Sequence, residues 1–350
     1  MKAKLSALHL LSAILALGFL AGCEKTSVTV PDSSQTAMVS TLAGNGEGGF
    51  ADGPGGAAQF GAPLGIAADT AGNLYVADTG NHRIRKITPA GEVSTLAGGE
   101  KGYADGTGSA ARFYEPSGIA IDAAGNLYVT DGINLRIRKV TPDGAVSTLA
   151  GDKADHAKDH ALQLQQPSAI AIDAAGNLYV ADGANHLILK VTPTGKVSTL
   201  AGGEVGFADG TGGVAQFSLP SGIAIDAAGN LYVADMANYR IRKITPAGEV
   251  STLADGTESA AQFNGPAGIA IDATGNLYVT DDNYIRKITP AGDVSTLAGR
   301  GKYPGYAEGL GSAAQFNYPH GIAMDIAGNL YVADRNNNRI RKIVIAGTKD

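Results

Sequence analysis

The chain has 350 residues with 49 glycines, a single cysteine and no tryptophan, and its formal charge is −6 at pH 7. This length suits one large β domain, and the many glycines are typical of a fold with many tight turns. The acidic balance and the lack of a strongly basic block argue against nucleic acid as a partner.

Residues 1–22 are predicted to be a targeting segment and not part of the folded domain. Two lysines near the start precede an apolar stretch from Leu5 to Leu20, and small residues then lead to Cys23 in the phrase Leu-Ala-Gly-Cys. This combination resembles a bacterial lipoprotein signal, which implies that Cys23 carries lipid such as palmitate and becomes the mature N-terminus. An ordinary secretory signal followed by a chance cysteine is the alternative.

The resemblance implies an extracytoplasmic protein tethered to a membrane. Residues 23–38 are polar and predict a flexible tether between the lipid and the domain. Glu24 resembles the residue that directs such proteins to the outer membrane, if the cell has two membranes. Because Cys23 is the only cysteine, no disulfide and no thiol chemistry are expected in the folded part.

Three short phrases recur along residues 39–346 and indicate one repeated structural unit. Val-Ser-Thr-Leu-Ala begins at Val39, Val93, Val146, Val197, Val250 and Val294. Gly-Asn-Leu-Tyr-Val-(Ala/Thr)-Asp ends at Asp78, Asp131, Asp182, Asp235, Asp281 and Asp334. A proline column comprises Pro63, Pro116, Pro167, Pro220, Pro266 and Pro319.

Each unit is predicted to form four short antiparallel strands. In the second unit these are Ile119–Asp122, Leu127–Thr130, Arg136–Val140 and Ala145–Leu149, which are rich in branched residues and separated by turn residues. The last unit stops after its third strand, whereas an orphan fourth strand, Val39–Ala43, precedes the first unit. The two ends therefore complete one blade, and the sequence predicts an all-β, six-bladed β-propeller that its N-terminal strand closes, followed by a tail at 347–350.

The repeat resembles the NHL family, which is named for the triplet Asn-His-Leu. That triplet stands at Asn185-His186-Leu187, and the wider pattern Pro-x-Gly-Ile-Ala-x-Asp-x-x-Gly-Asn-Leu-Tyr-Val-Ala-Asp recurs in the other units. The resemblance implies a six-bladed propeller. It does not imply one activity, because such propellers include lyases, lactonase-like enzymes and binding modules.

Residue types that recur in every unit are predicted to serve the blade, because a single functional site must break the six-fold repeat. The Asp that ends each second strand, as at Asp78, and the Arg that opens the next strand, as at Arg83, are expected to pair across the turn or with a neighbouring blade. Blade three has Leu187 and Leu189 instead, so Asp182 needs another partner. A ring of catalytic carboxylates is the alternative.

A second acidic column lies in the links between blades. In the phrase from Asp105 to Phe113, the acid is expected to cap a short helix and Phe113 to enter the core. A calcium-binding loop is the alternative, although the links lack the alternating oxygen ligands of such loops.

The histidines are candidate ligands for a metal ion. His156 and His160 are spaced like a metal pair but lie in a polar segment that predicts a solvated loop, and His82 and His186 lie at the tips between second and third strands. His320 stands alone in an inner-strand column that otherwise holds Leu, Ser or Ala, and it is predicted to face the mouth of the channel. No catalytic residue, metal or cofactor is predicted.

Blade five is short both in the link that enters it and in its second–third loop, so a notch is expected in the rim above it. The alternative is neutral drift in loop length. The candidate ligand-binding residues of the notch and its neighbourhood are Asp281, Asp282, Tyr284, Arg300, Lys302, Tyr303, Tyr306 and His320.

The favoured function is a membrane-anchored, extracytoplasmic binding or scaffold propeller with a protein, peptide or glycan ligand. The alternative is a metal-dependent propeller enzyme, lactonase-like or lyase-like, with an axial site. At least three His, Asp, Glu or Asn side chains that converge at the channel would favour the enzyme.

Overall fold

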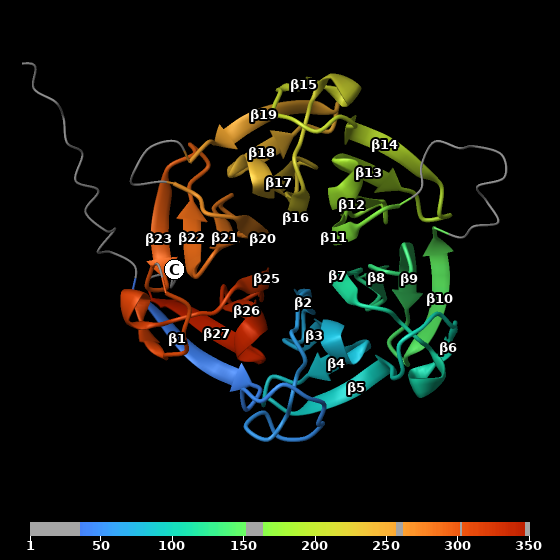
Figure 1. The fold of residues 1–350 in the computed structure, drawn as a ribbon, viewed down its shortest axis with the longest axis vertical. Helices are drawn as coiled ribbons and strands as arrows, with labels where there is room; N and C mark the ends of the chain where they lie inside the picture. The colour runs from blue at the N-terminus through green and yellow to red at the C-terminus, as the bar shows by residue number, and fades with distance from the viewer. Residues whose placement is uncertain (1–35, 152–163, 257–261, 302, 347–350) are drawn as a thin grey trace, which may run out of the picture. The chain divides into compact units, whose positions relative to one another are not determined.

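The protein is described by a computed structural model that covers residues 36–151, 164–256, 262–301 and 303–346. Six antiparallel sheets stand radially around a central channel, and the chain passes through them in order (Figure 1). The predicted all-β, six-bladed propeller is confirmed. Across these four ranges, no helix is both long enough and apolar enough to cross a membrane.

Each blade has four main strands, which run in the following order from the channel outward. Blade one comprises β2 (Ile66–Ala68), β3 (Leu74–Asp78), β4 (Arg83–Ile87) and β5 (Val93–Gly98). Blade two comprises β7 (Pro116–Ile121), β8 (Leu127–Asp131), β9 (Arg136–Val140) and β10 (Ala145–Ala150). Blade three comprises β11 (Pro167–Ile172), β12 (Leu178–Asp182), β13 (Leu187–Val191) and β14 (Val197–Gly202). Blade four comprises β16 (Pro220–Ile225), β17 (Leu231–Asp235), β18 (Arg240–Ile244) and β19 (Glu249–Ala254). Blade five comprises β20 (Pro266–Ile271), β21 (Leu277–Asp281), β22 (Tyr284–Ile288) and β23 (Val294–Ala298). Blade six comprises β25 (Pro319–Met324), β26 (Leu330–Asp334), β27 (Arg339–Ala346) and β1 (Thr36–Ala43).

The N-terminal strand closes the ring. β1 pairs antiparallel with β27, so that Val39 lies opposite Ile343, and the two ends of the described chain share one sheet (Figure 1). Val39 and Ala43 are fully buried, which ties the strand to the core by side chains as well as by backbone. The predicted closure is confirmed, and both strands extend three residues beyond the predicted Val39 and Ile343.

The links between blades form short edge strands and single 3-10 turns. The edge strands β6 (Gly106–Thr107), β15 (Gly210–Thr211) and β24 (Gly309–Leu310) pair with the outermost strands of blades two, four and six. The 3-10 turns in the links are η2 (Gly108–Ala110), η5 (Gly212–Val214) and η7 (Gly311–Ala313). Those between second and third strands are η1 (Thr79–Asn81), η4 (Gly183–Asn185), η6 (Met236–Asn238) and η8 (Arg335–Asn337).

Every hydrophobic core lies between two neighbouring blades and not within one. In one such core, Tyr75 and Ile84 of blade one pack with Ile119 and Val129 of blade two around the fully buried Phe113. The predicted place of Phe113 in the core is confirmed. Since each blade is stabilised by its neighbours, opening the ring at one blade uncovers apolar surface on both sides of the break.

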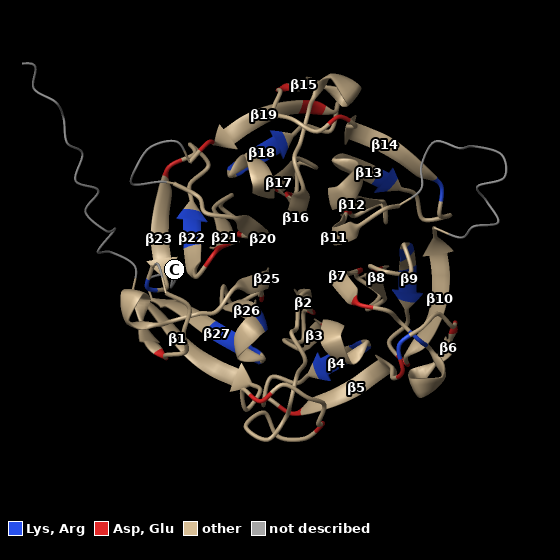
Figure 2. Ribbon diagram, in the orientation of Figure 1, with Lys and Arg blue, Asp and Glu red and all other residues tan. Residues whose placement is uncertain are grey.

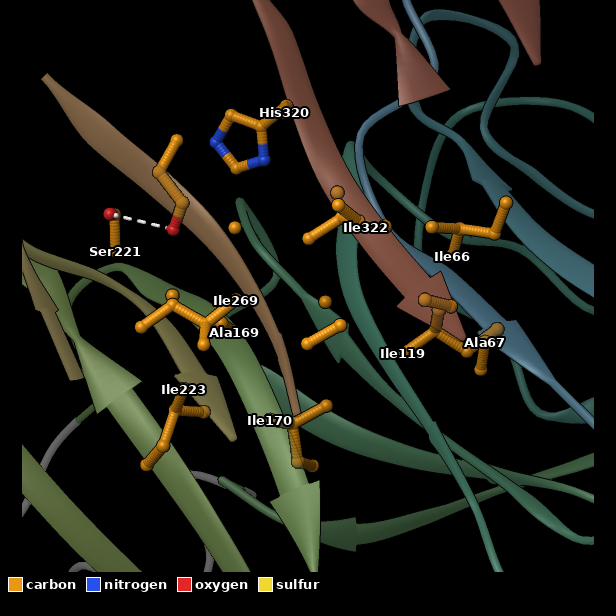
Figure 3. A pocket seen from close by; sticks show the side chains of 18 of the residues that line it. Ile66, Ala67, Ile119, Ala169, Ile170, Ser221, Ile223, Ile269, His320 and Ile322 are labelled. Atoms are coloured by element: carbon orange, nitrogen blue, oxygen red, sulfur yellow. Dashed lines mark hydrogen bonds between the residues drawn. The ribbon is translucent and has the colours of Figure 1, made fainter. Parts of the chain in front are cut away.

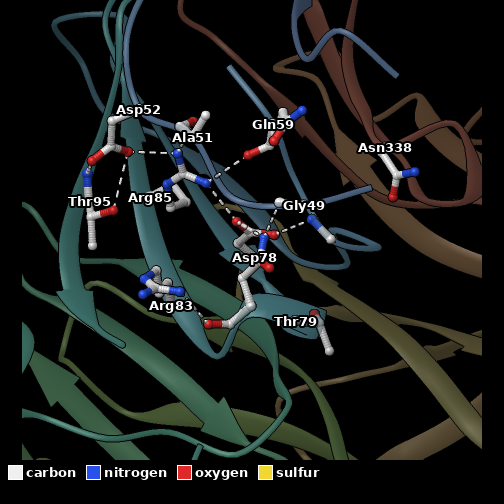
Figure 4. Close-up of polar contacts among 12 residues, drawn as sticks. Gly49, Ala51, Asp52, Gln59, Asp78, Thr79, Arg83, Arg85, Thr95 and Asn338 are labelled. Carbon is white, nitrogen blue, oxygen red and sulfur yellow. Dashed lines mark hydrogen bonds and ion pairs between the residues drawn. The ribbon is translucent and has the colours of Figure 1, made fainter. Parts of the chain in front are cut away.

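In five of the six blades, the buried arginine at the third position of the third strand binds the Asp that ends the second strand, as Figure 4 shows for Asp78 and Arg85 of blade one. Asp78 lies opposite Arg83 in the register, yet its carboxylate binds Arg85 at 2.6 Å, because the Arg83 guanidinium stacks on the ring of Phe50 at 3.8 Å. Arg85 also binds Asp52 of the link at 2.6 Å. The expected pairing of Asp78 with Arg83 was therefore wrong by two residues along the strand.

The acids in the links were expected to cap a short helix, but no acidic side chain caps the 3-10 turns η2, η5 and η7. The 3-10 turn after Asp105 begins at Gly108, and its N-cap residue Thr107 makes no side-chain capping hydrogen bond, while the Asp105 carboxylate binds Arg138 at 2.6 Å and accepts from the hydroxyl of Thr148. Equivalent buried arginines are Arg242, Arg286 and Arg341, and the third strands accordingly carry most of the basic residues in Figure 2.

Blade three lacks this arginine. Leu189 takes its place, and Asp182 instead accepts hydrogen bonds from the backbone N–H groups of Gln165 and Gln166 and from the side chain of Asn185. The prediction that Asp182 has another partner is confirmed. Blade three is thus the place where the repeat departs most from its own pattern.

Candidate functional site at the mouth of the axial channel

The innermost strands enclose a cavity of about 260 Å³ on the propeller axis (Figure 3). The inner strands approach one another closely, since a Cβ added at Gly65 would lie 2.0 Å from the carbonyl oxygen of Ser117 in the next blade. Blade five contributes Ile271 to the wall of the cavity, and every blade contributes an isoleucine from one shared position of its innermost strand. These are Ile66, Ile119, Ile170, Ile223, Ile269 and Ile322.

His320 is the one ionisable side chain among the described residues that line this cavity. β25 carries it, and its backbone carbonyl is held by the hydroxyl of Thr280 at 2.6 Å. Burial lowers the pKa of His320 to about 4, and the nearby Arg335 adds to the effect. The imidazole is therefore uncharged at neutral pH, and it stands at the channel mouth as its place in the inner-strand column predicts.

The three serines beside His320 form hydrogen bonds that join neighbouring blades of the propeller. Ser117 donates to the carbonyl of Pro167, Ser168 to that of Pro220, and Ser221 to that of Pro266, each in the next blade. These hydroxyl protons are used between blades, and no imidazole or carboxylate accepts from them. The serines are thus not arranged as nucleophiles.

A second cavity, of about 360 Å³, lies at the mouth of the channel above blades two and three. Glu115, Gln165 and Gln166 offer charge and amide groups, and Ile133 adds an exposed apolar side chain. Ser117, Ser168 and His320 line both cavities, so the two cavities adjoin at these residues. The walls come from links and second–third loops, which is the face where the sequence varies most from blade to blade.

Sequence reasoning missed this pocket, although a signal for it existed. The residue before the recurrent proline differs in every blade, and in blades two and three it lines the mouth. This column comprises Ala62, Glu115, Gln166, Leu219, Gly265 and Tyr318.

The backbone of Glu115 is held in a left-handed conformation, with φ of +54°. Its carbonyl accepts from the N–H of Gly132 at 3.2 Å, and its own N–H donates to Nδ1 of His82 in blade one at 3.3 Å. His82 also meets the ring of Tyr114 edge-on at 5.5 Å. The tip histidine is therefore a contact between blades, and His186 makes the equivalent bond to the N–H of Leu219 at 3.2 Å.

The acidic residues of the predicted notch have structural surroundings. Asp281 is fully buried, binds Arg286 at 3.1 Å and accepts from the N–H of Asn264. Asp282 is half-buried, and burial together with the neighbouring Asp281 raises its pKa. Tyr284 packs against Arg286, whose guanidinium lies 4.4 Å from the ring centre.

The notch residues do not line the two axial cavities. A depression of about 500 Å³ does lie at the shortened link into blade five, but its walls are formed by 238–240, 255–256 and 262–264. A role of Asp281, Asp282 and Tyr284 in ligand binding stays a prediction.

The predicted ligand-binding residues in the neighbouring link, which leads into blade six, differ in their surroundings. Arg300 is exposed and Tyr303 is 73% exposed, whereas Lys302 lies outside the described residues. Tyr306 stacks on Arg339 at 3.9 Å and repeats the contact that Phe50 makes in blade one, so it serves the blade.

The described residues do not supply a ligand set for a metal. Within them, no group of three or more His, Cys, Asp or Glu side chains is placed to hold an ion. His156 and His160 lie outside the described residues.

Two family models match the chain. NHL repeats match at residues 60–87 and 316–343, and the SMP-30/gluconolactonase/LRE-like region matches residues 103–255. The resemblance to the NHL repeat that the sequence suggested is thereby confirmed.

Curated relatives share the repeat over part of their length. Teneurin-m of Drosophila melanogaster is 29% identical over 212 residues, which cover 51% of this chain and 8% of that protein. The chloroplastic protein SUPPRESSOR OF QUENCHING 1 of Arabidopsis thaliana is 30% identical over 228 residues, covering 59% of this chain and 22% of its own. This chain thus spans less than a quarter of either protein.

Solved structures share the fold. A structural genomics protein of unknown function from Bacteroides thetaiotaomicron superposes with a TM-score of 0.68 at 22% identity, over 89% of this chain and 76% of that one. A gluconolactonase from Xanthomonas campestris superposes with a TM-score of 0.60 at 15% identity, over 88% and 90% of the two chains.

Proposed function

We propose that this protein is an extracytoplasmic binding propeller, tethered to a membrane through lipid on Cys23, that receives a peptide segment of a partner protein at the mouth of its axial channel. The observation that carries the proposal is the pair of adjoining cavities that share His320 at the variable face. There the six-fold repeat is broken by residues that differ from blade to blade.

The axial cavity selects for an apolar group. A cavity of about 150 Å³ lined by apolar side chains accommodates benzene, and the present one has about 260 Å³ behind a ring of six isoleucines. It is therefore large enough for a branched or aromatic side chain of the partner.

The mouth supplies the polar contacts that a peptide backbone needs. Glu115, Gln165 and Gln166 stand at the rim, and the neutral imidazole of His320 can accept or donate one hydrogen bond. A few polar groups around an apolar pocket are the usual composition of a small binding site. The group that enters the cavity is expected to be uncharged, since no described residue of its wall is charged at neutral pH.

Substitution of His320 by Trp is expected to block the cavity. Random heptapeptides displayed on phage are selected on the wild-type protein at pH 7.5, and we expect enrichment of peptides with Leu, Ile or Phe. His320→Trp should weaken the binding of the selected peptides at least about tenfold, a loss of about 1.4 kcal/mol. The chain has no tryptophan, so blue-shifted emission from residue 320 reports whether the indole fills the apolar cavity.

The matched control is Ile326→Ser, which changes an 81% exposed side chain in a first–second hairpin. Because these hairpins lie on the opposite face, peptide affinity should be unchanged. Equal loss in both variants, or binding on a glycan array without any selected peptide, would contradict the peptide site.

An axial metal-dependent enzyme of lactonase-like or lyase-like chemistry is the second candidate, and the family match over residues 103–255 favours it. The described channel wall offers His320 as its one imidazole and no carboxylate, a poor set for a divalent ion. Elemental analysis of protein purified without chelators should therefore find well below one equivalent of any transition metal. One full equivalent, lost on His320→Ala, would support the enzyme instead.

A further inference from the structure

Four hydrogen bonds between neighbouring blades have the same geometry, and all four lie on the face that carries the links and the second–third loops. In each, the N–H of the residue before the recurrent proline donates to a side chain at the tip of the preceding blade. The acceptor is Asn338 for Ala62 at 3.0 Å, and Asn283 for Tyr318 at 3.1 Å. In the two remaining contacts the acceptor is a histidine Nδ1.

A histidine acceptor differs from an asparagine acceptor in one respect. Nδ1 of His82 accepts from the Glu115 N–H at 3.3 Å only while it carries no proton. Protonation turns the acceptor into a donor that faces another donor, so the bond is lost. An asparagine oxygen gains no proton in mildly acidic solution and therefore keeps accepting.

The bond to His82 matters for the site because of the backbone it holds. Glu115 has a φ of +54° and precedes Pro116, a combination that a residue with a side chain adopts only under restraint. Glu115 and Gly132, whose N–H binds the Glu115 carbonyl, both line the mouth pocket. Loss of the His82 bond leaves that conformation with a single hydrogen bond and frees the one acidic side chain among the described residues of the pocket.

We propose that His82 is a pH-sensitive latch, whose protonation releases the Glu115 backbone and reshapes the mouth pocket above blades two and three. The effect on ligand binding rests on the proposed function, whereas the latch itself does not. His186 and Leu219 form a second copy of the contact, away from the pocket.

The charges around His82 set the pH range of the latch. Burial lowers the pKa of His82 from its usual value, with Lys101 and Arg83 acting in the same direction, while Glu115 and a hydrogen bond with the Thr79 backbone oppose them. The unfolded chain therefore takes up this proton first, and the stability that the neutral latch contributes is present above about pH 6.5 and is lost as the pH falls through the lower, folded-state pKa. His320, with its pKa of about 4, stays neutral over most of that range.

The test is amide hydrogen exchange in the full chain, with no ligand present. Protection of the Glu115 amide, relative to its intrinsic rate at each pH, is measured between pH 7.5 and pH 4.5. We expect protection to fall about two- to tenfold at the acidic end in the wild type, as for the loss of one hydrogen bond. His82→Asn should keep the protection at both ends, and His82→Ala should lose it at both.

His186→Asn serves as the matched control. It should leave the pH response of the Glu115 amide intact. Equal protection of Glu115 at both pH values in the wild type, or an unchanged acidic loss in His82→Asn, would overturn the latch. Because the readout needs no ligand, a failed peptide selection would not affect it.

Discussion

Deletion of Val39–Ala43 in β1 is expected to cause a large loss of stability. Removing Val39–Ala43 exposes the edge of β27 and takes two fully buried side chains out of the cores on either side of blade six. A buried valine such as Val39 contributes about 1.5–3 kcal/mol and the methyl group of Ala43 about 0.8 kcal/mol, and β27 also loses most of its outer hydrogen-bonded partner. A fall of roughly 5 kcal/mol in the free energy of unfolding is expected, out of the 5–15 kcal/mol usual for a domain.

Urea denaturation followed by far-UV circular dichroism measures the change. The control removes five residues of the predicted tether, 25–29, and should leave the midpoint in place. A synthetic peptide of residues 36–43 should restore part of the lost stability, because it can pair with the open edge of β27. If the deletion variant and the control unfold at the same urea concentration, closure by β1 contributes nothing to stability.

The architecture was predictable because the same sequence pattern occurs six times in the chain. A single Pro-x-Gly-Ile-Ala phrase would not distinguish a strand from a short buried helix, but the orphan strand at Val39 and the missing strand after Ile343 leave one arrangement that completes every blade. Hydrophobic alternation and hairpin glycines repeat at fixed places, so errors in one copy are corrected by the others.

The partner of each buried acid was not predictable in the same way. Asp78 lies opposite Arg83 in the sheet register, so pairing across the turn was the natural expectation. The choice of Arg85 depends on Phe50, which is far away in sequence and occupies the guanidinium of Arg83. Which of the two arginines binds Asp78 therefore depends on how the link packs against the blade. A local sequence pattern does not contain that information.

The mouth pocket was missed for a related reason. Loop lengths drew attention to blade five, whereas the pocket arises above blades two and three from the identity of single residues before the proline. His320 could be found because a histidine breaks a column of small residues. Glu115 could not be found by type alone, because exposed glutamates are common and its left-handed backbone is visible only in three dimensions.

The single substitution Cys23→Ser is expected to abolish membrane attachment completely. Cys23→Ser removes the sulfur that would carry the lipid, and the resemblance of Leu-Ala-Gly-Cys to a lipoprotein signal then predicts an uncleaved or soluble product. A single acyl chain gives only marginal membrane binding, with an association constant of about 10⁴ M⁻¹, so firm attachment calls for more than one chain on the residue. Wild-type protein should therefore remain with membranes after a high-salt wash, and the variant should not.

Membrane fractionation and intact-mass spectrometry read out the two parts of the prediction. The mass of the wild-type protein should correspond to a chain that begins at Cys23 and carries acyl groups. Lys25→Ser, two residues further on, is the control and should be processed and retained as the wild type is. If Cys23→Ser is cleaved at the same bond and stays with the membrane, attachment rests on another part of the chain. The propeller would then be held by its own surface and not by a lipid tether.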